Sequence, residues 1–386
     1  MSKNKFKNIL EALKVPCIAI LISLVVGGII IAITGSNPFR AFYALLQGCG
    51  FAPKNSYAGY KNIFTDFMSY LNYMTPMVFA ALAVAVAMRC GLFNIGVSGQ
   101  MLGAGFIASI VVGYSGLDGF IAKPLVVLIG IGAGALIGAL IGILKYRFNI
   151  NEVVSSIMLN YILQYSTSFF INTYFVDPVS RQSRSVSDAS RLALTDTVIG
   201  NLKMDIPLGI LLAAIAVICV WILLEKTKMG YEMKAVGFSR TAAKYAGINV
   251  GKNMVFSMTV SGALAGLAGV TYYLGYLASI QPKVLLSTGF DAIAVSLLGS
   301  NNPFGIVLST MLISLINKGS TYMKSQAGVE SEITSVITGI ILLFSACNVY
   351  MKWKLEHNKA EKLMKKRSEE AIGGEEAART EEKEGK

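Results

Sequence analysis

The sequence predicts an all-α, polytopic membrane protein with about ten transmembrane helices. The chain has 386 residues, of which 54% are hydrophobic, and its mean hydropathy is +0.59. Only 15% of the residues are charged, against roughly 25% in soluble domains. Apolar runs of about 18 residues or more can cross the roughly 30 Å of membrane hydrocarbon as helices, and about ten candidates occur. No soluble catalytic domain fits between them.

The first span is interpreted as a retained helix. Its basic start resembles a secretion signal, but the apolar run that follows is longer than a signal core and no A-x-A cleavage site comes after it. The stretch 284–317 is interpreted as two short spans joined by the turn SNNPFG, since a single span would put the basic cluster after Tyr350 outside. The expected spans are 15–34, 70–88, 92–113, 124–144, 153–172, 206–224, 254–278, 284–299, 303–317 and 333–350.

Basic residues predict the orientation of these spans. Lysines precede the first span and follow the last one, and the loops 145–152 and 225–252 are rich in Lys and Arg, whereas 176–205 is nearly neutral. The positive-inside rule therefore places both termini in the cytoplasm. The expected divisions are a cytoplasmic N-terminal segment, a transmembrane domain, a cytoplasmic loop within that domain and a charged, partly disordered cytoplasmic tail. They cover 1–14, 15–350, 225–253 and 351–386 respectively.

Two spans carry small residues at helical spacing. Gly130, Gly134, Gly138 and Gly142 recur every four residues in the span 124–144, and the stretch SGALAGLAG at 261–269 repeats the pattern. Such stripes let two helix backbones approach closely in lipid. We expect both to be packing surfaces.

Polar side chains interrupt two apolar stretches in a related way. In GLFNIGVSGQ, residues 91–100, Phe93 and Asn94 precede Val97-Ser98; in TGFDAIAVSLLG, residues 288–299, Phe290 and Asp291 precede Val295-Ser296. The expected topology runs the two stretches in opposite directions. They therefore predict an inverted repeat, an architecture that places substrate near the membrane midplane.

Unsatisfied polar groups are costly in hydrocarbon, so these side chains are expected to face the protein interior or a wet cavity. For Ser98 or Ser296 alone, helix-to-helix hydrogen bonds are the favoured interpretation. For Asn94 and Asp291, beside phenylalanines, a cavity that takes a ring-bearing polar solute is favoured. A further motif, NEVVSSIMLNYI at 151–162, has Asn151 as a helix cap, Glu152 in the first turn and Asn160 deeper. The expected substrate pathway comprises Phe93, Asn94, Ser98, Gln100, Asn160, Phe290, Asp291 and Ser296.

Several function classes are disfavoured by composition. The five cysteines lack CxxC spacing, and the only histidine, His357, lies in the tail, so no metal site and no catalytic residues are expected. The net charge of +12 follows the positive-inside pattern and does not indicate a nucleic-acid polymer as partner. No G-x-x-x-x-G-K-[ST] loop is present, so this chain is expected to bind no ATP and no other cofactor.

The basic loop MGYEMKAVGFSRTAAKYAGINVGKN, residues 229–253, contains a helix-like unit, SRTAAKYAGI. From its residues alone it is either a solvated loop helix or a segment that docks into a groove of a partner.

Four motifs together resemble a known family. FNIGVSGQ, NEVVSSIMLNYI, AVGFSRTAAKYAGI and GFDAIAVSLLGSNNPFG occur in the order seen in permease subunits of bacterial ABC importers. The chain is similar to the branched-chain amino acid, ribose and nucleoside permease family, closest to nucleoside or simple-sugar permeases, over roughly residues 15–350. Ser98 stands where many members have Glu.

The resemblance implies a type II, vitamin B12-like importer fold in the bacterial plasma membrane. It also implies a second permease subunit as heterodimer partner, ATP-binding cassette ATPase subunits that carry ATP and Mg, and an extracellular solute-binding lipoprotein. The segment 237–248 would then be the coupling helix. Its expected ATPase-coupling residues are Gly237, Arg240, Ala242, Tyr245, Ala246 and Gly247.

The predicted function is therefore that of a permease subunit, not an enzyme, which forms the pathway of an ATP-driven importer. Its expected cargo is a nucleoside or related ring-bearing polar solute, moved by alternating access. Two alternatives remain at this point: an ion-coupled secondary transporter, for which the inverted repeat and Asp291 are equally suitable, and the same importer type carrying a simple sugar.

Overall fold

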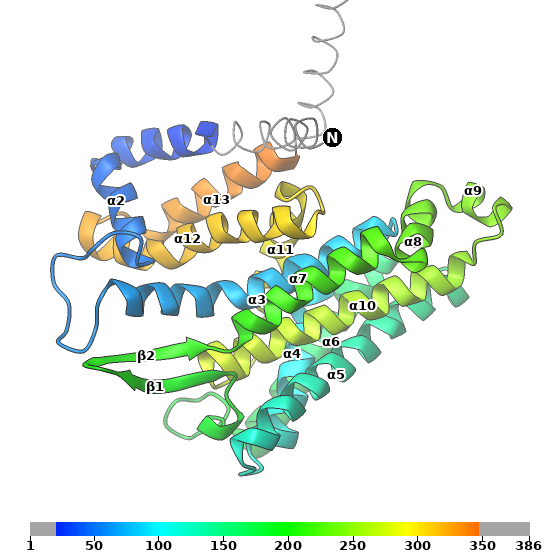
Figure 1. Ribbon diagram of the computed structural model, residues 1–386, viewed down its shortest axis with the longest axis horizontal. Helices are drawn as coiled ribbons and strands as arrows, with labels where there is room; N and C mark the ends of the chain where they lie inside the picture. The colour runs from blue at the N-terminus through cyan, green and yellow to red at the C-terminus, as the bar shows by residue number, and fades with distance from the viewer. Residues whose placement is uncertain (1–20, 347–386) are drawn as a thin grey trace, which may run out of the picture.

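A computed structural model describes residues 21–346 of the chain. The N-terminal segment 1–14, the tail 351–386 and the outer ends of the first and last expected spans lie outside the described residues. Figure 1 shows a helical molecule in which α2, α11, α12 and α13 lie on one side of α3, while α5, α6 and α10 lie on the other. The two groups of helices are called here the α12 layer and the α10 layer.

The helices follow the expected spans closely. The first described helix is Leu21–Ile33. Three later helices end in π-helical segments: α4 in Ser109–Gly113, α6 in Ile171–Phe175 and α10 in Tyr272–Leu277. The bounds are α2 Pro38–Gly48, α3 Ile63–Arg89, α4 Val97–Ala108, α5 Gly119–Phe148, α6 Glu152–Phe170, α7 Gly209–Lys226, α8 Lys228–Phe238, α9 Arg240–Tyr245, α10 Val250–Thr271, α11 Thr288–Leu298, α12 Pro303–Ala327 and α13 Ser331–Ala346.

Among the described residues, five helices are long and apolar enough to cross a membrane, or six if the first helix and α2, bent by 116°, count as one broken span. The five are α3, α5, α7, α10 with its π-helical end, and α12. Every other expected span overlaps a helix that fails this test, including α4, α6 and α11. Ten crossings therefore stay a prediction.

Besides α8, which lies within the expected cytoplasmic loop, two elements were not expected. The first is α2, which begins at Pro38 because Asn37 accepts hydrogen bonds from the Phe39 and Arg40 backbone N–H groups and Pro suits the first helical turn.

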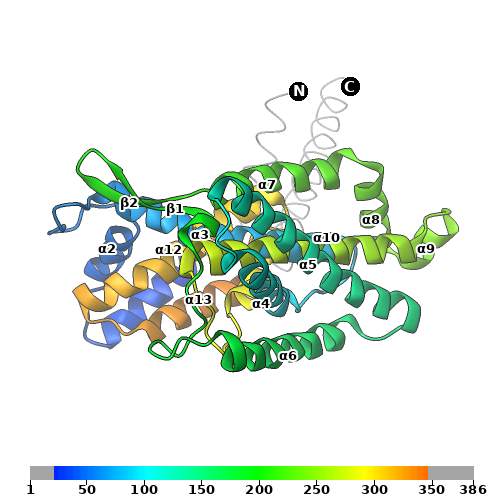
Figure 2. The same ribbon diagram turned by 90° about the horizontal axis from the view of Figure 1, so that it is seen from below.

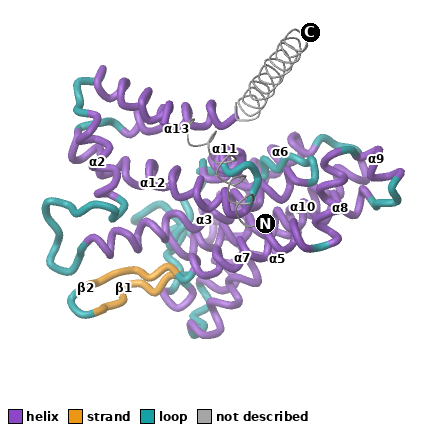
Figure 3. The backbone as a smooth tube through the Cα atoms, turned by 45° about the horizontal axis from the view of Figure 1, so that its top comes forward, coloured by secondary structure: helices purple, strands orange, loops and turns teal. Residues whose placement is uncertain are grey.

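The second is a β-hairpin, β1 Ala193–Ile199 and β2 Leu202–Pro207, within the loop expected at 176–205; the other named elements of the described chain are helices, as predicted. Alternating β-branched residues in β1 and the Gly200-Asn201 turn, with Gly200 at φ +63°, favour antiparallel pairing. The hairpin lies at the opposite end of the molecule from α8 and α9 (Figure 1), and Figure 3 shows it as the only strands in the described chain. These are called the hairpin end and the α9 end.

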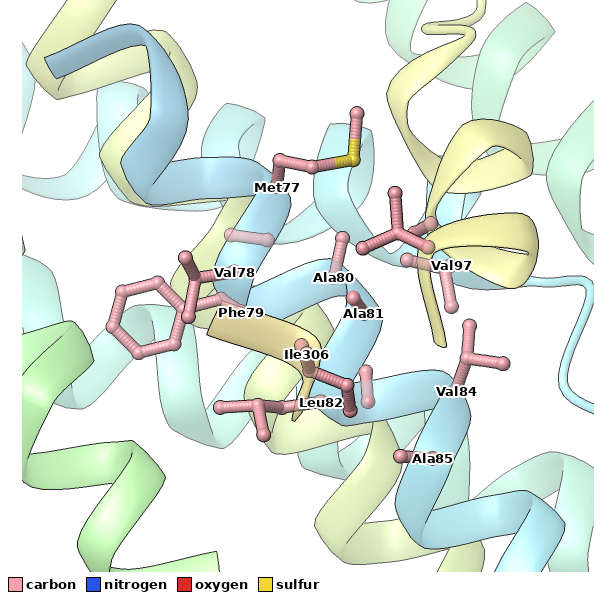
Figure 4. Close-up of a cluster of buried hydrophobic side chains, with 14 of the residues drawn as sticks. Met77, Val78, Phe79, Ala80, Ala81, Leu82, Val84, Ala85, Val97 and Ile306 are labelled. Atoms are coloured by element: carbon pink, nitrogen blue, oxygen red, sulfur yellow. The ribbon is translucent and has the colours of Figure 1, made fainter. Parts of the chain in front are cut away.

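The core is centred on α3. From Met77 to Ala87 every side chain of this helix is buried, which requires neighbours on all sides of the helix. Ala and Val fill most of these positions, so α7, α10, α11 and α12 can all pack closely around it. Figure 4 shows Val97 of α4 and Ile306 of α12 against this stretch.

The glycine stripes pack against each other, as expected. A Cβ on Gly134 of α5 would collide with the carbonyl oxygen of Gly262 on α10, and a Cβ on Gly266 would collide with that of Gly130. Close backbone contact of this kind lets van der Waals packing hold two helices together in lipid. The α5–α10 pair is therefore the main contact within the α10 layer.

We predict that Gly134→Ala destabilises the protein by about 1–3 kcal/mol, because the added methyl group overpacks the α5–α10 contact. The melting temperature of the purified protein in detergent measures the effect. The matched control is Gly132→Ala on the same helix, where a Cβ meets no heavy atom within 4 Å. Equal melting temperatures for the two variants would contradict the role of the stripe.

Candidate functional site

The motif at 91–100 forms a break between two helices. α3 ends at Arg89, residues 91–96 are not helical, and α4 begins only at Val97. α4 and its π-helical end have 12 and 5 residues, a length of about 25 Å together. The first four residues of α4, 97–100, are all buried, so α4 starts inside the bundle. Non-helical backbone at this depth is stable only where protein groups or a cavity satisfy it.

Asn94 lies at the centre of a buried hydrogen-bond network. Its amide nitrogen donates to Gln100 Oε1 at 3.0 Å and to Ser261 Oγ of α10 at 2.8 Å. Its oxygen accepts from the Gly96 backbone N–H at 2.9 Å. Ser261 Oγ in turn donates to the Ala83 carbonyl of α3 at 2.6 Å. One amide thus connects the helix break to both α3 and α10.

Asn160 satisfies the same break from α6. Its Oδ1 accepts from the Gly99 backbone N–H at 2.9 Å, and its Nδ2 donates to the Ile95 carbonyl at 3.0 Å. Gly99 lies in the first turn of α4, where backbone N–H groups have no partner within the helix. Asn160 therefore caps α4 from another helix. Figure 2 shows α6 at the outer edge of the bundle, and its contacts are with α4 and α5.

These positions differ from the cavity lining expected for Asn94. Asn94, Ser98, Gln100 and Ser296 are 0% exposed, and Asn160 is 2% exposed. The amides of Asn94 and Asn160 are buried because they hydrogen-bond to backbone groups at the helix break. The two serines hydrogen-bond within the protein: Ser98 Oγ donates to the Leu286 carbonyl and Ser296 Oγ to Asn301 Oδ1, each at 2.8 Å. Contact of these five side chains with solute stays a prediction.

α11 also begins inside the bundle and meets α4 there. Residues 278–287 are not helical, and α11 is only 11 residues long. A Cβ on Gly289 would collide with Ser98, so the starts of the two short helices touch. α11 runs opposite to α4, because its C-terminal turn returns to the end of α3, where Arg89 Nε donates to the Asn301 carbonyl at 3.1 Å. The meeting point is called the α4–α11 junction.

Three of the expected pathway residues have accessible surface. Phe290 is 44% exposed, and Phe93 and Asp291 are partly exposed. Asp291 lies in the first turn of α11, where the helix dipole favours a negative charge. Contact of these three side chains with a solute stays a prediction. Within residues 21–346, no cluster of three or more His, Cys, Asp or Glu side chains forms a metal site.

The basic loop forms two helices, α8 and α9, at the α9 end. The Ser239 hydroxyl caps α9 by accepting from the Ala242 N–H, and Gly247, at φ +78°, ends it while the Ile248 N–H bonds to the Ala243 carbonyl. The helix-like unit expected here is therefore confirmed. The expected coupling residues are all exposed: Gly237, Arg240, Ala242, Tyr245, Ala246 and Gly247.

This exposed unit is joined to the helix break. Arg240 Nη2 donates to the Gly91 carbonyl at 3.2 Å, and a Cβ on Gly237 would collide with the Arg89 carbonyl. Gly91 is three residues before Asn94. α8 and α9 are thus in direct contact with the segment that leads into the hydrogen-bond network.

Comparison with known proteins agrees with this arrangement. Residues 67–346 match the family described as "Branched-chain amino acid transport system / permease component". The chain belongs to this permease family. The resemblance read from the four motifs is thereby confirmed, and the helices just described are those of a membrane-spanning permease subunit.

Among similar proteins, the guanosine ABC transporter permease protein NupP of Bacillus subtilis is 36% identical over 348 residues, which cover 89% of this chain and 96% of NupP. The nucleoside ABC transporter permease protein NupB of Lactococcus lactis is 35% identical, over 95% of this chain and 100% of NupB. The glucose ABC transporter permease protein TsgB13 of Haloferax volcanii is 26% identical, over 87% and 88%.

The sequence analysis missed two exposed aromatic residues of the permease. Phe238, the last residue of α8, is 94% exposed, and Tyr231 on the same helix is 69% exposed. The sequence feature that could have indicated them is the occurrence of aromatic residues inside a basic loop, next to Gly230 and Gly237.

We predict that Asn160→Ala lowers the stability of the permease by about 1–3 kcal/mol, because the Gly99 N–H and the Ile95 carbonyl lose their buried partner. Thermal melting of the purified permease measures the change. Asn172→Ala, at an exposed position just after α6, is the control and should melt like the unchanged protein. A melting temperature for Asn160→Ala equal to that of this control would show that α4 does not need the cap.

Proposed function

We propose that the permease forms, with a second permease subunit, the translocation pathway of an ATP-driven importer for nucleosides in the bacterial plasma membrane. The carrying observation is the α4–α11 junction, where two interrupted helices of opposite direction meet and leave Phe93, Phe290 and Asp291 accessible. Interrupted helices that meet at depth are typical of transporter substrate sites. NupP and NupB, at 36% and 35% identity, are named as guanosine and nucleoside permeases, which supports a nucleoside as cargo.

The proposed orientation follows the charges. The basic α8–α9 unit lies in the cytoplasm and the hairpin lies outside, with the two chain ends on the cytoplasmic side. The ten spans, the inverted repeat and the type II, vitamin B12-like fold belong to this proposal. The division of the chain into 1–14, 15–350 and 351–386 belongs to it as well. In this proposal the protein described here is in a closed state, which opens during transport to expose the buried side chains Asn94, Ser98, Gln100, Asn160 and Ser296.

The partner subunits are part of the proposal as well. ATP and Mg are bound by separate ATP-binding cassette subunits, which dock on α9, within the loop 225–253. An extracellular lipoprotein delivers the solute at the hairpin end. Closure of the ATPase subunits pushes on α8 and α9, and the Arg240–Gly91 contact passes this movement to the helix break at Asn94.

The test is uptake of radiolabelled guanosine into vesicles that hold the complete complex. ATP-dependent uptake is expected. Uptake that survives ATP depletion and collapses with an ion gradient would replace this mechanism with ion-coupled transport. Uptake of glucose without uptake of guanosine would favour a simple sugar as cargo, a candidate that the similarity to TsgB13 supports.

We predict that Tyr245→Ala lowers solute-stimulated ATP hydrolysis about tenfold while the complex still assembles, because this tyrosine ring, 89% exposed, is a docking contact of the ATPase. Hydrolysis by the purified complex, with and without loaded binding protein, measures the coupling. Tyr245→Phe, which keeps the ring, is the matched control and should retain coupling. Full stimulation in Tyr245→Ala would remove α9 from the coupling contact.

A further inference from the structure

A lysine lies at membrane depth without an acidic partner. Lys318 is the sixteenth residue of α12, a helix apolar enough to cross a membrane. It lies about 22 Å along the helix from Pro303, and the turn before Pro303 contacts Arg89 at the α9 end. Among residues 21–346 no carboxylate forms an ion pair with it; its ammonium instead donates to Tyr276 Oη at 3.4 Å.

Two tyrosine rings lie beside this ammonium group. Lys318 Nζ is 5.4 Å from the ring centroid of Tyr276 and 5.8 Å from that of Tyr73. The two rings contact each other edge to face, with centroids 5.5 Å apart, and the ring of Tyr272 is 6.0 Å from Tyr276. All four side chains are partly exposed. We call Lys318, Tyr73, Tyr272 and Tyr276 the lysine–tyrosine cluster.

The chain offers a direct comparison. Lys54 also lies over two tyrosine rings, 4.8 Å from Tyr322 and 5.9 Å from Tyr57, but its ammonium is 2.7 Å from Asp66 Oδ2. The hydrogen-bonding capacity of Lys54 is thus partly used by a carboxylate. Lys318 has a similar aromatic setting and no such partner. Charged side chains inside a membrane protein are rare and mark solute pathways or pairs, and no pair is present here.

The cluster lies at the seam between the two layers. Lys318 belongs to α12, Tyr272 and Tyr276 belong to the π-helical end of α10, and Tyr73 belongs to α3 between them (Figure 1). Tyr73 is about 24 Å along α3 from Arg89, a depth similar to that of Lys318. The cluster is therefore nearer the hairpin end than the α9 end, on the side from which a delivered solute enters.

Its chemistry selects a class of ligand. An ammonium group offers three donors and no acceptor, so it binds carbonyl oxygens, ring nitrogens or hydroxyl oxygens, and it repels cations. Tyrosine rings stack on planar or sugar-ring faces, and their hydroxyl groups donate or accept. A neutral, ring-bearing solute rich in acceptors, such as a nucleoside, matches both features.

We propose that the lysine–tyrosine cluster is a solute-binding site of the permease, which receives a neutral nucleoside-class solute before it reaches the α4–α11 junction. This inference rests on the proposed function. Lys318 supplies the donors, and Tyr73 and Tyr276 supply the ring faces.

The experiment uses the complete complex in vesicles and a photoreactive azidopurine nucleoside as probe. Adducts on peptides that contain Tyr73 or Tyr276 are expected, with competition by guanosine. Lys318→Met should abolish these adducts and slow guanosine uptake about tenfold, the loss expected when a charged hydrogen-bond donor is removed. Lys318→Arg should keep both signals, and Lys54→Met should resemble the unchanged complex.

The outcomes separate the two proposals. Assembly and basal ATP hydrolysis that persist in Lys318→Met show that the variant folds. If the unchanged complex takes up guanosine but the adducts map elsewhere, or Lys318→Met transports normally, the cluster is not a solute site and the proposed function stands. If the unchanged complex takes up no nucleoside, the proposed function fails, and the cluster as a nucleoside site fails with it.

Discussion

This structure depends on one requirement: backbone polar groups must find partners where a helix is interrupted inside the membrane. The N–H groups of residues 90–92 still bond to carbonyls of α3, but residues 93–96 lie outside any helix, and hydrocarbon supplies no partners. Asn94 and Asn160 provide the missing partners from within the break and from α6. Because Asn94 also bonds to Ser261 of α10, the same groups that satisfy the break hold the α10 layer around the start of α4. The α4–α11 junction can form only because α4 is fixed in this way.

The same break gives the chain a segment that can change shape next to α8 and α9. A continuous helix from residue 63 to 108 would place α8 and α9 beside a rigid rod, whereas a non-helical segment can change its backbone angles locally. Arg240 contacts the carbonyl of Gly91, the first residue of that segment, and Gly237 packs against Arg89. The physical requirement for coupling is an element with two arrangements that both ends can bias. The segment 91–96 has the position that such an element needs.

The sequence predicted the parts of the fold that depend on hydropathy and spacing, and the parts that depend on partners were harder to predict. The apolar runs indicated where most helices lie, and the glycine stripes indicated the α5–α10 contact, since both are properties of one segment. For Asn94 the sequence showed that a partner was needed, but a backbone break, which also binds Asn160 of α6, satisfies polar groups as well as a cavity does. The hairpin was missed because period-two alternation over seven residues is a weak signal beside strong helical hydropathy.

Lys318 shows the same limit in a more specific form. The span expected at 303–317 ends one residue before Lys318, because a charged residue ends an apolar run in a hydropathy pattern. The helix α12 nevertheless continues to Ala327. Lysine is a good helix former, so the helix continues through it, and Tyr73 and Tyr276, contributed by two other elements, lie beside its ammonium group. Aromatic faces stabilise a cation by about 0.5–2 kcal/mol, less than the roughly 2.5–3.5 kcal/mol that a lysine costs at the centre of a membrane helix. The hydrogen bond to Tyr276 Oη adds to this stabilisation, and Lys318 lies nearer the hairpin end than the α9 end, where a long side chain can bring its charge towards the interface at a lower cost.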